Sequence, residues 1–592
     1  MVELVIRIVG TPGDGIISSG DILTLAAARS GRYVSTYRSF PTEIRGEDQS
    51  LYQLRISSKK ILTSADEIDI LIAFNEKFLR DNIADLKKGG AVIFDSSIND
   101  EKFKEYKNIT KYFVPIANLA KEFATERSKN MVALGILLGL APNFEINEQI
   151  KSDIQKKYET KDRQIVENNV QAFEKAYIWA RQNLEKEAFL EKLVIEPSGK
   201  KLIMSGCEAM ALGALVAGCK FYSGYPITPA TEIMEFLAKE LPRLGGNVLQ
   251  CEDEIAAITA ALGASFSGVK AMTATSGPGL SLMSEAIGLA SMAELPVVIA
   301  DVQRGGPSTG LPTKTEQSDL NLAIYGTHGD TPKIVLAPIN VEDSFYQTVK
   351  AFNYAEKYQV PVIILSDVSL GERRECIDEF DIKDIEVINR LKPEKLNENE
   401  SFSRYTQTYS GISPMTTPGE KGGAYIATGL EHTEDSSPSS KPHVHAAMTE
   451  KRFKKIETAQ SEFLAAKTYG DDDAKFGIIS WGSTSGAVLE AIDLAEKQGY
   501  KIQALYPRII YPFPTKWIND FLHNKEMLLI VERNYCGQFA NTIVYRCTCL
   551  NKDIKIHNLM KYNGEPFTTK EIFNKIDQII KGQYLKFMTH QH

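Results

Sequence analysis

The sequence predicts an α/β fold made of three α/β modules in series. Hydrophobic runs of the length of buried strands alternate along the chain with helical patterns, an order typical of parallel sheets covered by helices. In addition, 592 residues are more than one hydrophobic core normally holds. We place the modules at residues 1–190, 200–380 and 475–592, and a connector at 381–474.

The first module begins with the strand pattern "ELVIRIVG", the turn "GTPGDG" at 10–15 and the helix pattern "SSGDILTLAAARSG". "IDILIAFN" and "GGAVIFDSS" are further strands, and this repetition predicts a parallel sheet. Amides at a helix N-terminus can bind an anion. However, the turn lacks G-x-G-x-x-G spacing, and Asp14 would repel a phosphate, so a structural turn is favoured.

The second module has five buried-strand candidates, and the third has two strand-and-helix segments. Between them the composition changes to Pro-, Ser-, Thr- and Gly-rich segments followed by a charged helix, which predicts a long, partly ordered connector. The five strands are "CKFYSGYP", "VKAMTAT", "LPVVIADVQ", "KIVLAP" and "VPVIILSD", and the third module contains "KFGIISWGSTSGAVLEAIDLAEKQG" and "EMLLIVERNYCGQFANTIV".

Composition excludes several classes of protein. The chain has 43% hydrophobic and 24% charged residues and a net charge of −8 without a basic stripe, which disfavours nucleic-acid binding. It lacks the run of about 18 apolar residues that would cross a bilayer. The first residues, "MVELVIRIVG", have no basic leader and predict a strand instead of a signal peptide. We therefore expect a cytoplasmic protein.

The cysteines and histidines predict no metal site in this chain. The seven cysteines are widely spaced and form no C-x-x-C pair, which is typical of free thiols in a reducing compartment. His443 and His445 have no Asp, Glu or Cys at ligand spacing and lie in the connector. Any redox cluster would have to lie on another chain.

Two segments of the second module point to a ligand site. In "YPITP", Pro226 and Pro229 enclose Thr228, so its hydroxyl is held in a rigid loop. In "CEDEIAAITAALG", acidic residues open a helix that continues with small apolar residues. They are commonly partners of the helix dipole. Glu254, however, is flanked by apolar residues and has a face that can point inward, where desolvation favours a protonated carboxyl.

Two further loops follow predicted strands. "TSGPG" forms a turn at Ser276 and Gly277, where the backbone can approach a flat ligand closely. Arg304 enters the glycine-rich loop "QRGGPSTG", a place that suits bidentate capture of a carboxylate. The alternative is a cation on a surface loop.

Together, "YPITP", "EDEIAA", "TSGPG" and "VQRGGPSTGLPTKTEQSDL" resemble the α subunit of the 2-oxoacid:ferredoxin oxidoreductases, in the form with a γ domain fused at the N-terminus. "GGAYIATGLEHTED" and "VERNYCGQ" extend the resemblance over nearly the whole chain. It implies a γ-type domain, a pyrimidine-binding domain for thiamine diphosphate and a transketolase C-terminal-like domain. The γ-type domain departs from the family pattern at Pro12, Asp14 and Glu47.

The resemblance also implies roles for individual residues. Glu254 matches the glutamate that hydrogen-bonds the cofactor's aminopyrimidine, Arg304 the residue that holds the substrate carboxylate, and Thr228 the threonine that reaches the substrate. Ser308 and Thr309 are possible contributors to substrate binding. The remaining expected cofactor contacts are Tyr225, Pro226, Ile227, Ser276 and Gly277.

The implied reaction is the coenzyme A-dependent oxidative decarboxylation of a 2-oxoacid, or its reverse. The loop "GPSTGLPTKTEQSDL" looks most like the 2-oxoglutarate enzymes. The chain lacks the family's G-D-G…N magnesium motif and its cluster cysteines, so the resemblance implies a β subunit with Mg²⁺, the diphosphate site and a [4Fe-4S] cluster. It further implies ferredoxin as the electron acceptor and an (αβ)₂ assembly.

Other functions stay open at this stage. The substrate could be pyruvate or a branched-chain 2-oxoacid. A non-redox thiamine diphosphate enzyme half is an alternative within enzymes, although it would need neither a cluster-bearing partner nor a γ domain. A non-catalytic scaffold of the same fold is the alternative outside enzymes, and the presence of Glu254, Thr228 and Arg304 argues against it.

Overall fold

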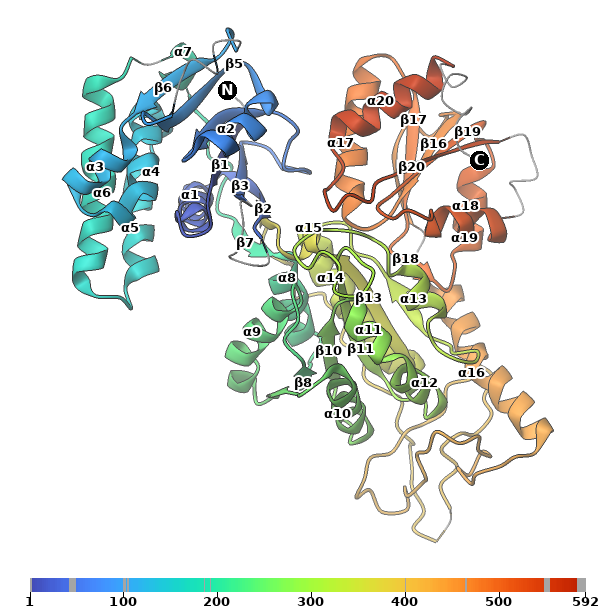
Figure 1. Cartoon of the computed structure of the whole chain (residues 1–592). Coiled ribbons are helices and arrows are strands. Elements are labelled where there is room, and N and C mark those ends of the chain that lie inside the picture. The colour runs from blue at the N-terminus through green and yellow to red at the C-terminus, as the bar shows by residue number, and fades with distance from the viewer. Residues whose placement is uncertain are drawn as a thin grey trace. The chain divides into compact units, whose positions relative to one another are not determined.

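The computed structural model confirms the α/β fold, and the residues that it describes form three β-sheets. It describes residues 3–41, 49–98, 103, 106–185, 187–191, 193–399, 401–463, 466–547 and 554–582. The chain forms two compact units (Figure 1). The first contains Met1–Met204 and Glu372–Phe380, and the second contains Ser205–Gly371 and Asp381–His592.

The first unit is built on an eight-stranded sheet in the order β6-β5-β4-β1-β3-β2-β14-β7. Its elements are β1 (Glu3–Gly10), α1 (Ile16–Arg29), β2 (Tyr33–Ser39), β3 (Ser50–Ser57), β4 (Ile68–Ala73), α2 (Glu76–Asn82), β5 (Leu86–Asp95), β6 (Thr110–Val114), α3 (Ile116–Phe123), α4 (Lys129–Leu140), α5 (Asn147–Tyr158), α6 (Arg163–Asn183), α7 (Ala188–Glu191), β7 (Leu202–Ser205) and β14 (Arg374–Ile377).

This sheet is mixed, so the predicted all-parallel sheet is wrong. Strands β1, β4, β5 and β6 run parallel to one another, as the strand–helix alternation indicates. In contrast, β3 pairs antiparallel with both β1 and β2. Strand β14 pairs antiparallel with β2 through Glu375 and Ser35, so a segment from the middle of the chain completes the sheet.

The two faces of the first sheet have different covers. Alternate residues of a strand point to opposite faces. Leu4, Ile6 and Ile8 of β1 pack in the cluster that contains α1 and α3–α6, whereas Val5 and Val9 pack with α2. Figure 1 shows α3, α4, α5 and α6 gathered on one side of the sheet.

In the turn at 10–15, an acidic side chain of the turn binds a backbone amide of the same turn. The Asp14 carboxylate accepts hydrogen bonds from the Thr11 amide at 2.8 Å and from the Thr11 hydroxyl at 2.5 Å. Gly15 caps α1 with φ of 77°, a conformation that favours glycine. The carboxylate thus accepts the hydrogen bond of an amide that a bound anion would need. This agrees with the prediction that the segment is a structural turn. Glu47 lies outside the described residues.

The second unit contains a seven-stranded sheet in the order β18-β12-β13-β11-β10-β8-β9. All neighbours in it are parallel except β18, which pairs antiparallel with β12. Its elements are α8 (Gly206–Val216), β8 (Phe221–Gly224), α9 (Thr231–Glu240), β9 (Asn247–Gln250), α10 (Glu254–Phe266), β10 (Ala271–Thr275), α11 (Gly277–Leu282), α12 (Ser284–Met292), β11 (Val297–Gln303), α13 (Leu320–Tyr325), β12 (Ile334–Leu336), α14 (Val341–Tyr358), β13 (Pro361–Asp367), α15 (Val368–Gly371) and β18 (Ile509–Tyr511).

The same unit holds a five-stranded sheet in the order β15-β17-β16-β19-β20. One hydrophobic cluster contains residues of both sheets, including Ile299 of β11 and Ile530 of β19, which joins them in one body. The remaining elements are α16 (Pro442–Glu462), β15 (Lys467–Gly470), β16 (Phe476–Ser480), α17 (Ser485–Lys497), β17 (Ile502–Tyr506), α18 (Thr515–Leu522), β19 (Met527–Glu532), α19 (Gln538–Arg546), β20 (Lys555–Met560) and α20 (Thr569–Ile580).

A buried charge cluster anchors the connector to the second unit. Glu294, fully buried after α12, accepts hydrogen bonds from Lys451 at 2.8 and 2.9 Å and forms an ion pair with Lys455. Arg404 donates to the Glu294 carbonyl at 3.0 Å and to Gln359 at 2.9 Å. Two cations of α16 thus contact the Glu294 carboxylate, and Arg404 of the connector binds the backbone carbonyl of the same residue.

Within the described residues, no helix is both long and apolar enough to cross a membrane.

Candidate functional site

Four predicted site residues lie at the carboxyl edge of the seven-stranded sheet. Thr228 follows β8, Glu254 follows β9, Ser276 follows β10 and Arg304 follows β11. These four parallel strands are neighbours in the order β11-β10-β8-β9. Ligands of open α/β sheets bind beyond the carboxyl ends of the strands. The topology therefore brings together residues that are up to 76 positions apart in sequence.

Glu254 is a buried carboxyl that the helix does not need. Asp253 caps α10, because its side chain accepts a hydrogen bond from the Ala256 amide at 2.7 Å. Glu254 follows it and is only 4% exposed, whereas Ile255 beside it is 48% exposed. Within the described part of the chain, the Glu254 carboxylate makes no hydrogen bond. Burial without a partner favours a ligand-binding role over a dipole role.

The glycines of "TSGPG" make room for carboxylates. A Cβ added to Gly279 would lie 2.5 Å from Oε1 of Glu254 and 2.0 Å from Oγ1 of Thr275. A Cβ on Gly277 would lie 2.6 Å from Oδ2 of Asp319. The neighbouring Ser276 hydroxyl is buried and has no hydrogen-bond partner among the described residues.

Substituting Gly279 by alanine should therefore damage both the fold and the site. We expect a loss of about 1–3 kcal/mol in stability, because the methyl group must displace Thr275 and Glu254. Gly263→Ala is the matched control, since a Cβ there meets nothing within 4 Å and alanine favours the helix. Thermal unfolding of both variants, with their turnover, measures the effect. Equal stability of the two variants would contradict the packing argument.

Arg304 is buried at the edge of the site. Its Nη1 donates to the Thr228 carbonyl at 2.7 Å, and its Nε is buried without a partner in the part of the chain that the structure describes. Burial lowers the pKa of Arg304, while Asp319 and Glu254 act in the opposite direction. The side chain of Thr228 is exposed, so the loop presents its hydroxyl to solvent while its carbonyl positions the guanidinium.

A pocket of about 700 Å³ lies beside Arg304. Of the predicted residues, Gly277, Arg304 and Ser308 line it, whereas Glu254, Thr228, Ser276 and Thr309 do not. Tyr225, Pro226 and Ile227 do not line it either. The lining residues are Gly277, Pro278, Ser281, Arg304, Gly305, Gly306, Pro307, Ser308, Glu316, Ser318, Asp319, Leu322, Asn534, Tyr535, Cys536, Gln538 and Tyr562.

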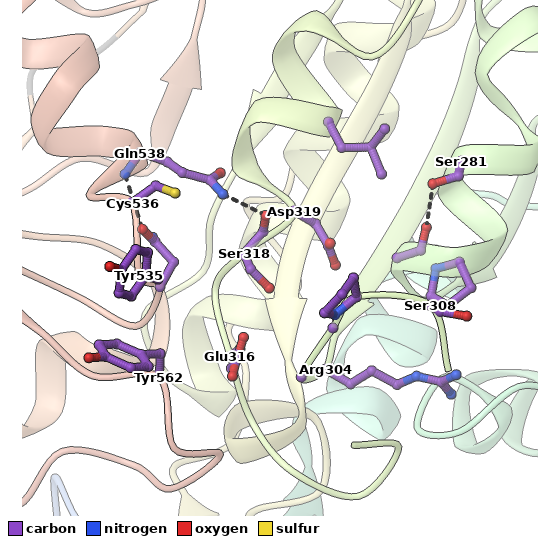
Figure 2. Close-up of a pocket in the computed structure, with 17 residues that line it drawn as sticks. Ser281, Arg304, Ser308, Glu316, Ser318, Asp319, Tyr535, Cys536, Gln538 and Tyr562 are labelled. Atoms are coloured by element: carbon purple, nitrogen blue, oxygen red, sulfur yellow. Dashed lines mark hydrogen bonds between the residues drawn. The ribbon is translucent and has the colours of Figure 1, made fainter. Parts of the chain in front are cut away.

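Both sheets of the second unit contribute to this pocket. In Figure 2, Tyr535 and Tyr562 lie on one side of the view, Arg304, Ser308 and Ser281 on the other, and Glu316, Ser318 and Asp319 between them. The two tyrosine rings pack edge to face, with their centroids 5.0 Å apart. Sequence reasoning missed the residues after β19, although "NYCGQ" follows a buried strand directly, which was the available signal.

A buried network fixes the loop that carries the pocket. Arg533 forms a 2.7 Å ion pair with Asp367 and donates to Thr315 at 2.7 Å. The Gln317 amide donates to the Arg533 carbonyl at 2.7 Å, and Gln538 donates to the Ser318 carbonyl at 2.8 Å. The loop after Arg304 is thus tied to the segment after β19, and the pocket shape is preorganised.

One of the two predicted-linker histidines pairs with a carboxylate of the connector. His445 lies 2.6 Å from Glu431, which also pairs with Arg452. Among the residues that the structure describes, no group of three or more His, Cys, Asp or Glu side chains is arranged to hold a metal ion.

Comparison with known proteins explains this arrangement. Residues 212–451 match the family "Pyruvate flavodoxin/ferredoxin oxidoreductase, thiamine diP-bdg". Residues 5–179 match "Pyruvate ferredoxin/flavodoxin oxidoreductase", and residues 474–572 match "Pyruvate:ferredoxin oxidoreductase core domain II". The subunit alpha of 2-oxoacid:ferredoxin oxidoreductase 1 from Sulfurisphaera tokodaii is 32% identical over 97% of both chains. The chain belongs to the 2-oxoacid:ferredoxin oxidoreductase α subunits.

Other members of the family extend the comparison. The 2-oxoglutarate oxidoreductase subunit KorA of Mycobacterium tuberculosis is 34% identical over 98% of this chain and 92% of its own. A solved 2-oxoglutarate:ferredoxin oxidoreductase from Magnetococcus marinus, with 2-oxoglutarate, coenzyme A and succinyl-CoA bound, has 40% identity. It aligns with a TM-score of 0.91 over 98% of this chain and 100% of that one. The resemblance seen in the sequence is confirmed.

The residues of this α subunit fit thiamine diphosphate. The family match over 212–451 names a thiamine diphosphate-binding domain. At the carboxyl edge of that sheet lie the buried carboxylate of Glu254 and the buried hydroxyl of Ser276, neither of which has a hydrogen-bond partner among the residues that the structure describes. Gly277 and Gly279 keep the backbone free of side chains beside them. An aminopyrimidine needs such a carboxyl and such an open backbone.

Proposed function

We propose that this chain is the catalytic α subunit of an enzyme that converts 2-oxoglutarate, coenzyme A and oxidised ferredoxin to succinyl-CoA, carbon dioxide and reduced ferredoxin, or runs the reverse reaction. The observation that carries the substrate choice is the full-length likeness, at 40% identity, to the 2-oxoglutarate enzyme of Magnetococcus marinus. The pocket beside Arg304, about 700 Å³ in volume, has room for a small dicarboxylic acid.

In this proposal, individual residues of the chain have separate roles in the reaction. Glu254 would hold a proton on its carboxyl and share it in a hydrogen bond with the aminopyrimidine of the cofactor. Arg304 binds the substrate carboxylate with the guanidinium that the Thr228 carbonyl orients. The Thr228 hydroxyl contacts the substrate. Thiamine diphosphate, when bound, supplies the electron sink that makes loss of carbon dioxide possible.

In this proposal, the remaining predicted residues contact the cofactor or the substrate. Tyr225, Pro226, Ile227, Ser276 and Gly277 surround the cofactor. Ser308, which lines the pocket, and Thr309 in the same loop bind the distal carboxylate of the substrate. Ser308 has a φ of 57°, so the loop turns sharply at this position.

Several parts of the proposal concern other molecules. A β subunit holds Mg²⁺ and the diphosphate and carries a [4Fe-4S] cluster, ferredoxin takes up the electrons, and the complex is an (αβ)₂ assembly in the cytoplasm. The α-subunit membership supports the existence of a partner chain. We expect the polypeptide on its own to be inactive.

Anaerobic reduction of a viologen dye by the co-expressed αβ complex tests this function. We expect dye reduction that requires both coenzyme A and 2-oxoglutarate. The families that match this chain are named after pyruvate, which makes pyruvate the second candidate substrate, so pyruvate and a branched-chain 2-oxoacid are assayed separately. Activity with pyruvate alone would overturn the substrate choice. A cofactor-loaded complex without coenzyme A-dependent reduction would point to a non-redox thiamine enzyme.

A further inference from the structure

Two carboxyls near Arg304 have no role in the function described so far. Asp301 lies in β11 and is fully buried. Both of its carboxyl oxygens lack a hydrogen-bond partner in the described part of the chain, as does Oδ2 of Asp319. Asp319 lines the pocket and lies between its two sides in Figure 2. An unpaired buried carboxylate is costly, so these groups need an explanation.

The position of Asp319 is fixed by its neighbours. Its amide donates to Oε1 of Gln303 at 3.1 Å, and the Gln303 side chain in turn donates to the Ser366 carbonyl at 2.8 Å. The two carboxyl oxygens lie 2.6 and 2.7 Å from the place where Gly277 would carry a Cβ. The missing side chain of Gly277 therefore provides the space in which the acid reaches the pocket wall.

Charge around Asp319 favours its protonated form. Burial and the carboxylate of Glu316 raise the pKa of Asp319 to about 7, and Arg304 acts in the opposite direction. Burial and Asp319 raise the pKa of Asp301 well above its usual range. Burial also raises the pKa of Glu316. Arg304 is influenced by the charges of Asp319 and Glu254, and Glu316 by that of Arg533. An ionised Asp319 would add a negative charge beside Arg304, and this charge would repel an anionic substrate.

We propose that Asp319 is a further substrate-binding residue, which enters the pocket as a neutral carboxylic acid and donates a hydrogen bond to an oxygen of the bound 2-oxoacid, with Asp301 as its neutral buried neighbour. This inference rests on the proposed function for the identity of the ligand. It assigns the pocket two donors of different kinds, the charged guanidinium of Arg304 and an uncharged acid.

Two substitutions of Asp319 separate the roles of its proton and its charge. In the wild-type αβ complex, kcat/KM for the 2-oxoacid should fall as the pH rises through about 7, because the donor is lost on ionisation. Asp319→Asn keeps a donor that does not titrate, so this fall should vanish, with kcat/KM about threefold lower at acid pH. Asp319→Leu has no donor and should lose about tenfold, mainly through KM.

The control is Glu285→Gln, the same acid-to-amide change at an exposed position of α12. Its pH profile should match the wild type. If Asp319→Asn loses more than tenfold at every pH, or keeps the wild-type fall, the neutral-acid role is overturned.

An infrared titration of the resting complex provides a readout that needs no turnover. A protonated carboxyl has a carbonyl stretch that an ionised one lacks. The contribution of Asp319 to this band should disappear as the pH rises through about 7 in the wild type and be absent from Asp319→Asn. A spectrum that Asp319→Asn leaves unchanged would overturn the proposal. If the band titrates but no 2-oxoacid is oxidised, the acid is neutral as inferred, yet its role in binding 2-oxoacids is overturned together with the proposed function.

Discussion

Replacing Glu254 by glutamine should lower kcat by about 10²–10⁴-fold in the reconstituted αβ complex. Glutamine has the same shape, so it fits beside Gly279, but it cannot hold a transferable proton. The Glu254 carboxylate is buried and has no hydrogen bond within the described residues, which leaves it free for the cofactor. The thermal stability of the variant should stay close to that of the wild type, because no internal partner is lost.

The matched control is Glu252→Gln, the same change two residues earlier at an exposed position. It should leave dye reduction unchanged. Asp253→Ala provides a second comparison, since loss of the helix cap should cost about 1 kcal/mol of stability. Turnover of Glu254→Gln within threefold of the wild type, in a complex loaded with cofactor, would show that Glu254 is not the proton-holding group.

Replacing Glu294 by glutamine should produce the largest loss of stability. The substitution leaves Lys451 and Lys455 buried without their carboxylate, and breaking a buried ion pair on one side costs about 3–5 kcal/mol. Since the chain forms two compact units, we would follow the loss of stability by hydrogen–deuterium exchange in α16 and the connector as well as by thermal unfolding. Exchange should accelerate there first.

A second substitution makes the electrostatic cause testable. Adding Lys455→Met to Glu294→Gln removes one unpaired cation and should restore part of the stability, whereas Glu457→Gln, an exposed acid of the same helix, should have no measurable effect. A double variant that is less stable than Glu294→Gln alone would contradict the charge argument and point to packing instead.

The stability from Glu294 should also depend on pH. Burial alone would raise the pKa of Glu294, but the charges of Lys451, Lys455 and Arg404 outweigh it and hold the pKa well below its usual range. A carboxyl whose pKa is depressed by folding stabilises the folded state above its unfolded pKa of about 4.3. This contribution is lost as the pH falls toward the folded value.

The sequence predicts best what is encoded locally. Strand, glycine turn and helix follow one another at β1 and α1, and the structure contains both as expected. Parallel and antiparallel pairing are not encoded locally. Strands β2 and β3 are not among the strands predicted from the alternation of strand and helix patterns, and their antiparallel pairing makes the sheet mixed.

The same distinction holds for the site. Thr228, Glu254, Ser276 and Arg304 could be predicted because each follows a buried strand of one parallel sheet, where ligands collect. Tyr535 lies more than 200 residues from Arg304 and comes to the same pocket only through packing of the two sheets of the second unit. No local pattern carries that information. The position of the Asp319 carboxylate likewise depends on the space left by Gly277, which is distant in sequence.

Strand β14 shows that the first unit is not a contiguous piece of the chain. Residues Glu372–Phe380 leave the second unit, add a strand beside β2 and then return. A polypeptide cut after Met204 would keep β2 but lack the strand that covers its outer side, and exposed strand edges invite pairing between molecules. The first unit therefore needs a strand that comes from a later part of the chain. For protein engineering, excising this unit requires a replacement for β14 as well as a new C-terminus.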